Sequence, residues 1–328
     1  MLFRSAFRLA VTRKPNWALA HCNLGVALAD TGDQEGAEAA LRQALDLEPD
    51  HTLARGNLAG LLSTRLMRLQ YRPVLDENTL TALAQEYGAL CPAAKALPKR
   101  PRPPCEPLRV GFVSPDLCDH PVGFFLLPLL QHLDRQRIQP VMYSTGGRDD
   151  ETRQALKALG MWVDVAHLDD ASLLHNLRNH QLDVLIDLSG HTAGHRLPVF
   201  AQRAAPIQVS WLGYFATTGV PAMDYLLMDD WHVPAGAEDQ FTEQVIRLPH
   251  SRFCYQPLPF APAVSPPPCM TNRYVTFGSF NNTAKLNEAV LSLWARLLHA
   301  QPTARLVLKS YAFSEASQRQ KMTQAFVD

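Results

Sequence analysis

Residues 182–194 read LDVLIDLSGHTAG, and this stretch decides the fold class that the sequence predicts. Five apolar residues surround two aspartates in its first half, and a Ser-Gly-His-Thr turn follows directly. A run this short and apolar is typical of a strand buried on both faces, as in a parallel sheet. Ligands of open α/β sheets bind beyond the carboxyl ends of the strands. His191 therefore lies where an active-site residue would lie, with Asp187 and Ser189 just before it.

A second histidine follows another predicted strand. Residues 108–113 (LRVGFV) lead into SPDLCDHP, which places His120 just after the end of that strand. Two histidines that follow two strands of one sheet predict a shared cleft.

Predicted strands and helices alternate from Leu108 onward, which indicates a parallel sheet with right-handed crossovers. The predicted strands are 108–113, 138–144, 162–167, 182–188, 207–212 and 223–228, and the helices are 121–133, 149–159, 171–180 and 195–203. Beyond a Pro-rich break, a second lobe is predicted from strands at 274–280 and 304–310, a helix at 287–300 and another helix beginning near Ser314. We expect this second lobe to be incomplete, because a single βαβα portion is too little for a closed α/β domain.

The N-terminal part repeats itself at a spacing of 34 residues, which is typical of tetratricopeptide arrays. The matching pairs are Pro15 and Pro49, Ala20 and Ala54, Asn23 and Asn57, Leu24 and Leu58, and Leu28 and Leu62. Two helices, about 17–31 and 34–47, are predicted to form the unit, with Gly32-Asp33 as the turn between them. Gly25 and Ala37 would let these helices approach closely.

These patterns divide the chain into five predicted segments. Tetratricopeptide repeats occupy 1–65, with one full unit at 16–49 and partial flanking units. A helix, most clearly at 77–90, and a Pro-rich linker form 66–106. A Rossmann-like lobe follows at 107–256, then a Pro-rich linker at 257–272, and the start of a second lobe at 273–328.

Composition excludes several classes of protein. The formal net charge is zero, whereas nucleic-acid binding would require a basic excess on one face. No apolar run reaches the roughly 18 residues that a membrane helix requires. Six cysteines are scattered without paired spacing, which favours neither a disulfide framework nor a zinc site and fits a reducing cytoplasm. His191 and His195 have the i,i+4 spacing of a zinc motif, but the residue after His191 is Thr192 rather than Glu, so no metal is expected.

Several long motifs of the chain carry a resemblance to a known family. DHPVGFF, DLSGHTAG, APIQVSWLGYFATTG, MDY and FGSFNNTAKLN occur in that order behind a tetratricopeptide array. The chain in this respect strongly resembles the bacterial O-GlcNAc transferase and SPINDLY-like family over roughly residues 16–320. The resemblance implies a GT-B fold with two Rossmann-like lobes and transfer of a sugar from a UDP donor to Ser or Thr of proteins. It also implies that the chain is truncated within the second lobe, where much of the family's nucleotide site lies.

The resemblance carries site residues onto this chain. His120 and His191 match active-site positions of the first lobe, and Lys285 matches the lysine that holds the diphosphate. Residues assigned to substrate binding are Asp187, Thr192, Gly213, Tyr214, Thr217, Gly219 and Asn282. Asn282 stands where many members of the family have Gln, so the chain departs from the family pattern at this phosphate contact.

The chemistry of sugar transfer explains these residue types. The barrier falls when a lysine stabilises the negative charge that develops on the leaving diphosphate, which is the role expected of Lys285. The N-terminus of the helix beginning near Leu286 would add partial positive charge. A histidine suits transfer of the acceptor's proton near neutral pH. The sequence does not choose between His120 and His191 for this role.

We therefore expect an inverting, metal-independent protein O-GlcNAc transferase that uses a UDP-sugar as donor and needs no cofactor. A protein acceptor recruited by the tetratricopeptide surface is the expected partner. Two other functions stay open: a SPINDLY-type protein O-fucosyltransferase, and a non-catalytic tetratricopeptide binding module with a degenerate GT-B lobe. We expect the 328-residue chain to be nearly inactive by itself, because the second lobe is incomplete.

Overall fold

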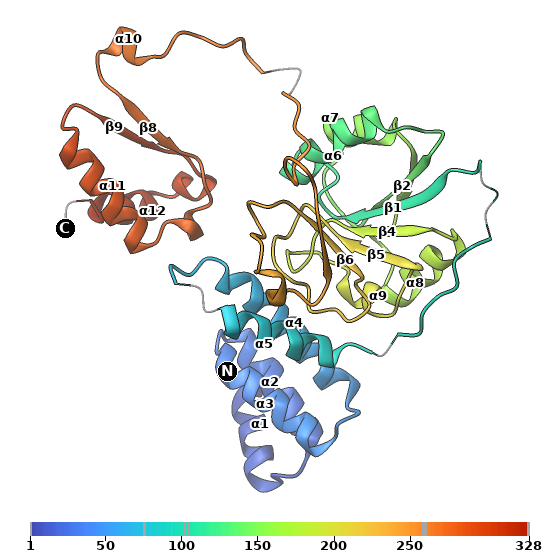
Figure 1. Ribbon diagram of the computed structural model, residues 1–328. Coiled ribbons are helices and arrows are strands. Elements are labelled where there is room, and N and C mark those ends of the chain that lie inside the picture. The colour runs from blue at the N-terminus through green and yellow to red at the C-terminus, as the bar shows by residue number, and fades with distance from the viewer. Residues whose placement is uncertain are drawn as a thin grey trace. The chain divides into compact units, whose positions relative to one another are not determined.

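The computed structural model describes residues 2–74, 77–92, 94–101, 103, 105–257 and 261–326. The chain divides into two compact units. The first comprises Met1–Met67 with Asp76–Gln256, and the second comprises Arg68–Leu75 with Pro257–Asp328. The tetratricopeptide helices and the first α/β sheet thus belong to a single unit (Figure 1).

The N-terminal helices confirm the predicted repeat. Helices α1 (Leu2–Arg13), α2 (Ala18–Asp30), α3 (Gln34–Leu47) and α4 (Thr52–Leu69) follow one another, and α5 (Glu77–Leu90) comes next. Helices α2 and α3 reproduce the predicted pair within one residue at each end. Gly32 has a φ of +84° in the turn between them, a conformation that glycine adopts without strain.

Close approach of α2 and α3 depends on small residues, as predicted. A Cβ added to Gly25 would lie 2.7 Å from the Leu41 side chain. Ala37 and Ala44 are completely buried on the facing side of α3. Asp33 caps α3 by accepting a hydrogen bond from the amide of Gly36.

A seven-stranded, all-parallel sheet forms the centre of the α/β region, in the order β3-β2-β1-β4-β5-β6-β7. The strands are β1 (Leu108–Ser114), β2 (Ile138–Ser144), β3 (Met161–Asp164), β4 (Val184–Asp187), β5 (Ile207–Ser210), β6 (Tyr225–Met228) and β7 (Gln244–Arg247). The sequence predicted the first six. It missed β7, because this four-residue edge strand alternates exposed and half-buried residues and lacks the apolar run of a central strand.

Helices cover both faces of this sheet, as a parallel sheet requires. Figure 1 shows α6 (Pro121–His132) and α7 (Glu151–Lys157) on one side and α8 (Asp170–Asn179) and α9 (Leu197–Ala201) on the other. Phe112, Leu126, Met142 and Leu156 belong to one buried core between the sheet and the first pair of helices. Strand β4, which the apolar run at 182–188 predicted, is buried at its last three residues.

The second unit has a smaller α/β arrangement. Its two parallel strands are β8 (Thr276–Ser279) and β9 (Arg305–Leu308), and its helices are α10 (Cys269–Asn272), α11 (Glu288–Ala300) and α12 (Ala316–Gln324). The predicted strand–helix–strand–helix order is confirmed. None of the described residues of this unit is fully buried. Among the described helices of the whole chain, none combines the length and hydrophobicity of a membrane span.

Candidate active site

Three neighbouring strands bring the predicted first-lobe residues to one edge of the sheet. His120 follows β1, the 187–194 turn follows β4, and the 211–219 loop follows β5. Strands β1, β4 and β5 are adjacent and parallel, so their carboxyl ends lie at the same edge. This is the edge at which open α/β sheets bind ligands.

Asp187 organises the turn after β4. Its carboxylate accepts hydrogen bonds from the amides of Ser189 at 3.1 Å and Gly190 at 2.7 Å, and the side chain is buried. Burial raises the pKa of Asp187 to about 6, although the two amide donors oppose this shift. Gly190 has a φ of +54°, and a Cβ there would lie 2.2 Å from the Cβ of Tyr214. Asp187 thus holds a glycine turn against the next loop.

His191 is buried, with both ring nitrogens bonded inside the protein. Its Nε2 lies 2.9 Å from the carbonyl oxygen of Thr218, and its Nδ1 lies 2.9 Å from the hydroxyl of Ser63. Burial, helped by the nearby ring of His195, lowers the pKa of His191 to about 3. The imidazole is therefore neutral at physiological pH. A catalytic role for His191 stays a prediction, whereas its contacts give it a bridging position between helix α4 and the 211–219 loop.

The side chain of Thr192 makes a hydrogen bond within the 187–194 turn. Its hydroxyl donates to the carbonyl oxygen of Ser189 at 2.8 Å. The substrate contact that the resemblance implies for Thr192 stays a prediction, and in this structure its hydroxyl stabilises the turn that carries His191.

The 211–219 loop packs tightly against its neighbours. A Cβ on Gly213 would lie 1.9 Å from the carbonyl oxygen of Leu188, so only glycine fits there. Tyr214 is buried, and its ring meets that of His191 edge-on at a centroid distance of 5.3 Å. Gly219 has a φ of +68°, and a Cβ there would lie 2.1 Å from the carbonyl oxygen of Ala84 in α5.

Thr217 anchors the loop to the start of β7. Its hydroxyl donates to the carboxylate of Glu243 at 2.7 Å, and Glu243 also accepts from the amide of Thr218 at 2.7 Å. Sequence reasoning missed Glu243, because a single Glu beside an unrecognised edge strand carries no local signal. Its buried carboxylate fixes the second half of the predicted loop.

Arg252 is a second residue that the sequence did not reveal. It is buried, and its guanidinium donates to the carbonyl oxygens of Leu212 and Tyr214. Burial lowers its pKa to about 10, while the carboxylate of Asp229 opposes this shift. Leu212 has a φ of +70°, a strained conformation for a residue with a side chain. Arg252 thus stabilises the strained start of the loop.

His120 differs from His191 in exposure. It caps α6, where its Nδ1 accepts a hydrogen bond from the amide of Val122 at 3.3 Å, and its side chain is 43% exposed. The carboxylate of Asp116 lies 3.8 Å from the same nitrogen. Burial raises the pKa of Asp116, while the charge of a protonated His120 would lower it. Of the two predicted histidines, His120 is the one that solvent reaches.

Asn282 and Lys285 belong to the second unit. Asn282 begins the 3₁₀ turn Thr283–Lys285 by accepting a hydrogen bond from the amide of Ala284 at 3.0 Å. Lys285 ends this turn with an exposed side chain. Helix α11 then starts behind Asn287, which accepts from the amide of Val290 at 3.1 Å. The predicted helix N-terminus close to Lys285 is therefore present.

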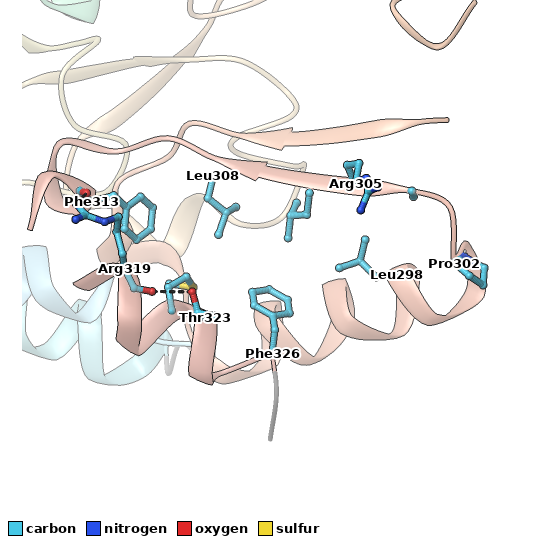
Figure 2. A pocket seen from close by; sticks show the side chains of 11 residues that line it. Leu298, Pro302, Arg305, Leu308, Phe313, Arg319, Thr323 and Phe326 are labelled. Carbon is cyan, nitrogen blue, oxygen red and sulfur yellow. Dashed lines mark hydrogen bonds between the residues drawn. The ribbon is translucent and has the colours of Figure 1, made fainter. Parts of the chain in front are cut away.

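A cavity of about 660 Å³ also lies in the second unit (Figure 2). It is lined by Leu298, Pro302, Ala304, Arg305, Leu306, Leu308, Phe313, Arg319, Met322, Thr323 and Phe326. None of the predicted site residues is among these described lining residues. Within the part of the chain that the structure describes, no group of three or more His, Cys, Asp or Glu side chains could hold a metal ion.

Comparison with protein families agrees with this arrangement. The model of glycosyl transferase family 41 matches residues 77–257, which include β1 to β7 and every first-lobe site residue discussed above. The chain belongs to glycosyl transferase family 41. A tetratricopeptide repeat model matches residues 18–51, the span of α2 and α3.

Several curated relatives carry the same kind of name, "Probable UDP-N-acetylglucosamine--peptide N-acetylglucosaminyltransferase SPINDLY". The tomato protein is 40% identical over 66% of this chain and 24% of its own length. The rice protein is 36% identical over 86% of this chain and 30% of its own length. The chain thus spans between about a quarter and a third of the length of these members of the family.

A solved structure, a mutant of the Thermobaculum terrenum O-GlcNAc transferase, is similar over 98% of this chain and 61% of its own. The TM-score is 0.73 at 34% sequence identity. The predicted fold class, tetratricopeptide helices followed by α/β of the GT-B type, is confirmed. The predicted O-GlcNAc transferase and SPINDLY-like relationship is confirmed as well.

Proposed function

We propose that this protein transfers N-acetylglucosamine from UDP-N-acetylglucosamine to Ser or Thr hydroxyls of proteins, with inversion at the sugar carbon. One observation carries the proposal. The residues that match glycosyl transferase family 41 include all those that build the carboxyl edge of the seven-stranded sheet, and the SPINDLY relatives are named peptide N-acetylglucosaminyltransferases.

The residues support a division of labour. His120, exposed at the end of β1, is the better placed of the two histidines to meet an acceptor, because both ring nitrogens of His191 are bonded inside the protein. Lys285, exposed and next to the start of α11, is suited to stabilising a leaving diphosphate. The chemistry needs no metal if a lysine and helix dipole meet this charge.

The partners and compartment belong to the same proposal. Helices α2 and α3 form a tetratricopeptide unit, and such units present surfaces that bind peptides, which supports a protein acceptor. All six cysteines are free, which supports a reducing compartment such as the cytoplasm.

The test is a transfer assay on the protein expressed from its complete reading frame. Radiolabelled UDP-N-acetylglucosamine and GDP-fucose are offered in parallel with a Ser/Thr-rich peptide, with and without EDTA. We expect EDTA-resistant labelling from the UDP donor, at a hydroxyl identified by mass spectrometry. Labelling from GDP-fucose alone would replace the proposal with fucosyl transfer. Peptide binding without any transfer would identify a non-catalytic binding module.

Lys285→Ala gives the first quantitative prediction. We expect turnover to fall by about 10²–10³, because the charge on the leaving group loses its stabilisation in the transition state. The KM for the peptide should change little, since the lysine acts on the donor. Lys321→Ala is the matched control, because Lys321 is another exposed lysine of the second unit, on α12. Equal turnover in the two variants would remove Lys285 from the mechanism.

A further inference from the structure

His191 and His195, which follow strand β4, share one hydroxyl that comes from helix α4. Ser63, on α4, is buried, and its Oγ lies 2.9 Å from Nδ1 of His191 and 3.0 Å from Nε2 of His195. Ser63 is separated from these residues by more than 120 positions along the chain. Ser63 lies between the tetratricopeptide match at 18–51 and the family 41 match at 77–257, and outside every motif quoted above.

The hydrogen bonds run in a row through His191, Ser63 and His195. The backbone groups at the two ends of this row fix the direction of each bond. Nε2 of His191 faces the carbonyl oxygen of Thr218, which only accepts, so Nε2 carries a proton and Nδ1 is an acceptor. At the other end, Nδ1 of His195 accepts from the amide of Leu197 at 3.3 Å, so Nε2 of His195 carries its proton. The hydroxyl of Ser63 therefore donates to His191 and accepts from His195.

We propose that Ser63 is a positioning residue of the candidate site: its hydroxyl, presented by α4, holds the rings of both His191 and His195 in the orientation that their outer contacts require. Through His191 it also holds the carbonyl of Thr218, and with it the loop that ends at Gly219. Helix α4 is then a structural part of the lobe that carries the candidate site.

The neighbouring groups exclude other ring orientations and other tautomers of His191 and His195. The ring of Tyr87, on α5, meets that of His191 edge-on at a centroid distance of 4.8 Å, and the ring of Tyr214 closes the other side. A proton added to Nδ1 of His195 would face the amide proton of Leu197. A proton added to Nδ1 of His191 would face the hydroxyl of Ser63, which would then have to turn its own proton away. Only the neutral Nε2–H tautomer of each ring satisfies all the partners.

Nitrogen NMR of the histidine rings tests this proposal on the 328-residue chain itself. In the unsubstituted protein at pH 7, we expect both His191 and His195 as neutral Nε2–H tautomers, with their signals assigned through His195→Gln. An Nδ1–H tautomer or a charged ring at either position would overturn the proposal, whatever any variant does.

Ser63→Ala is the second arm. We expect Nδ1 of His191 to move toward the chemical shift of an unbonded imine nitrogen, and Nε2 of His195 to lose its acceptor, while the His120 ring keeps its signals. Thr64→Ala is the matched control on the same helix, because the hydroxyl of Thr64 donates to the carbonyl oxygen of Gly60 within α4 at 3.0 Å and the residue is exposed. Unchanged His191 and His195 signals in Ser63→Ala would contradict the proposal.

The kinetic arm alone rests on the proposed function. In the protein from the complete reading frame, Ser63→Ala should lower kcat for transfer by about 10- to 100-fold, as expected when a site group is misplaced by a fraction of an ångström to an ångström. Thr64→Ala should keep the unsubstituted rate. A full rate in Ser63→Ala would show that the bridge is irrelevant to catalysis. Absence of transfer in the unsubstituted protein would refute the proposed function, while the NMR arms would still decide the hydrogen-bond chain.

Discussion

Strands β4 and β9 are each four residues long, parallel to a neighbour and rich in aliphatic residues, yet they differ in how they are covered. β4 lies between β1 and β5, with helices on both faces, and its last three residues are buried. β9 has β8 as its only strand neighbour among the described residues, and exposed and half-buried side chains alternate along it. The comparison shows that an apolar pattern predicts a strand, whereas the number of neighbouring elements decides its burial.

The same contrast appears in the cavity of the second unit. Leu298 and Leu308 line an open space in Figure 2, and Leu306 lines it too, whereas the aliphatic side chains of the first unit fill a closed core. Val307, on the other face of β9, is 47% exposed. Packing, rather than composition, separates the two units.

The largest effect we expect from this contrast is in amide exchange. Amides of β1 and β4 should exchange only through global unfolding, because both strands are buried within a seven-stranded sheet. Amides of β8 and β9 should open locally and exchange at least about 10³-fold faster. Hydrogen–deuterium exchange with mass spectrometry measures both in one sample. Comparable protection in the two sheets would break the comparison.

A matched pair of leucine substitutions gives the next effect. Leu185 on β4 is fully buried, so Leu185→Ala should lower the free energy of unfolding of the first unit by about 2–5 kcal/mol. Leu306 on β9 is only half-buried, so Leu306→Ala should lower the stability of the second unit by less than about 1 kcal/mol. Urea titrations of both variants measure these costs. A larger cost at Leu306 would mean that the second unit is better packed than its exposure indicates.

Acid should destabilise the first unit by a comparable or smaller amount. Burial lowers the pKa of His191 to about 3 and that of His195 to about 4, where Asp170 opposes the shift and Arg196 adds to it. Because unfolding returns both rings to a pKa near 6.5, their contribution is complete above this pH and is lost as the pH falls toward 4. Asp187 acts in the opposite sense below pH 6, because its folded pKa of about 6 exceeds the ordinary value.

Two histidines outweigh one aspartate, so we expect a net loss on the order of 3 kcal/mol between pH 7 and pH 4.5. Urea titrations at several pH values measure it. His195→Gln removes one titrating ring and should flatten the dependence. An unchanged slope in that variant would show that the ring of His195 already takes up its proton in the folded protein.

Much of the fold could be predicted from the sequence because its signals are local or periodic. The 34-residue repeat gave α2 and α3, and aliphatic runs gave β1 to β6. β7 was not predicted, because an edge strand needs only one apolar face. The alternation of polar and apolar residues in QVIR is too short to distinguish a strand from a loop.

The candidate site likewise has a part that the sequence predicts and a part that it does not. The order of parallel strands places His120, His191 and Gly213 at one edge without any knowledge of side chains. The partners that hold them, Ser63 and Arg252, are single polar residues whose importance comes from contacts across 128 and 40 positions of sequence. No local pattern marks such residues, so only the folded chain identifies them.

The interlocking of Gly88 and Gly219 has a practical consequence for exchanging recognition modules between proteins. A Cβ on Gly88 of α5 would lie 2.1 Å from the carbonyl oxygen of Gly219, and a Cβ on Gly219 would lie 2.1 Å from that of Ala84. Together with the Ser63 contact, this makes α4 and α5 inseparable from the sheet. A chimera that borrows a foreign repeat array should therefore be joined between α3 and α4, at 48–51, so that the last repeat helix travels with the transferase lobe.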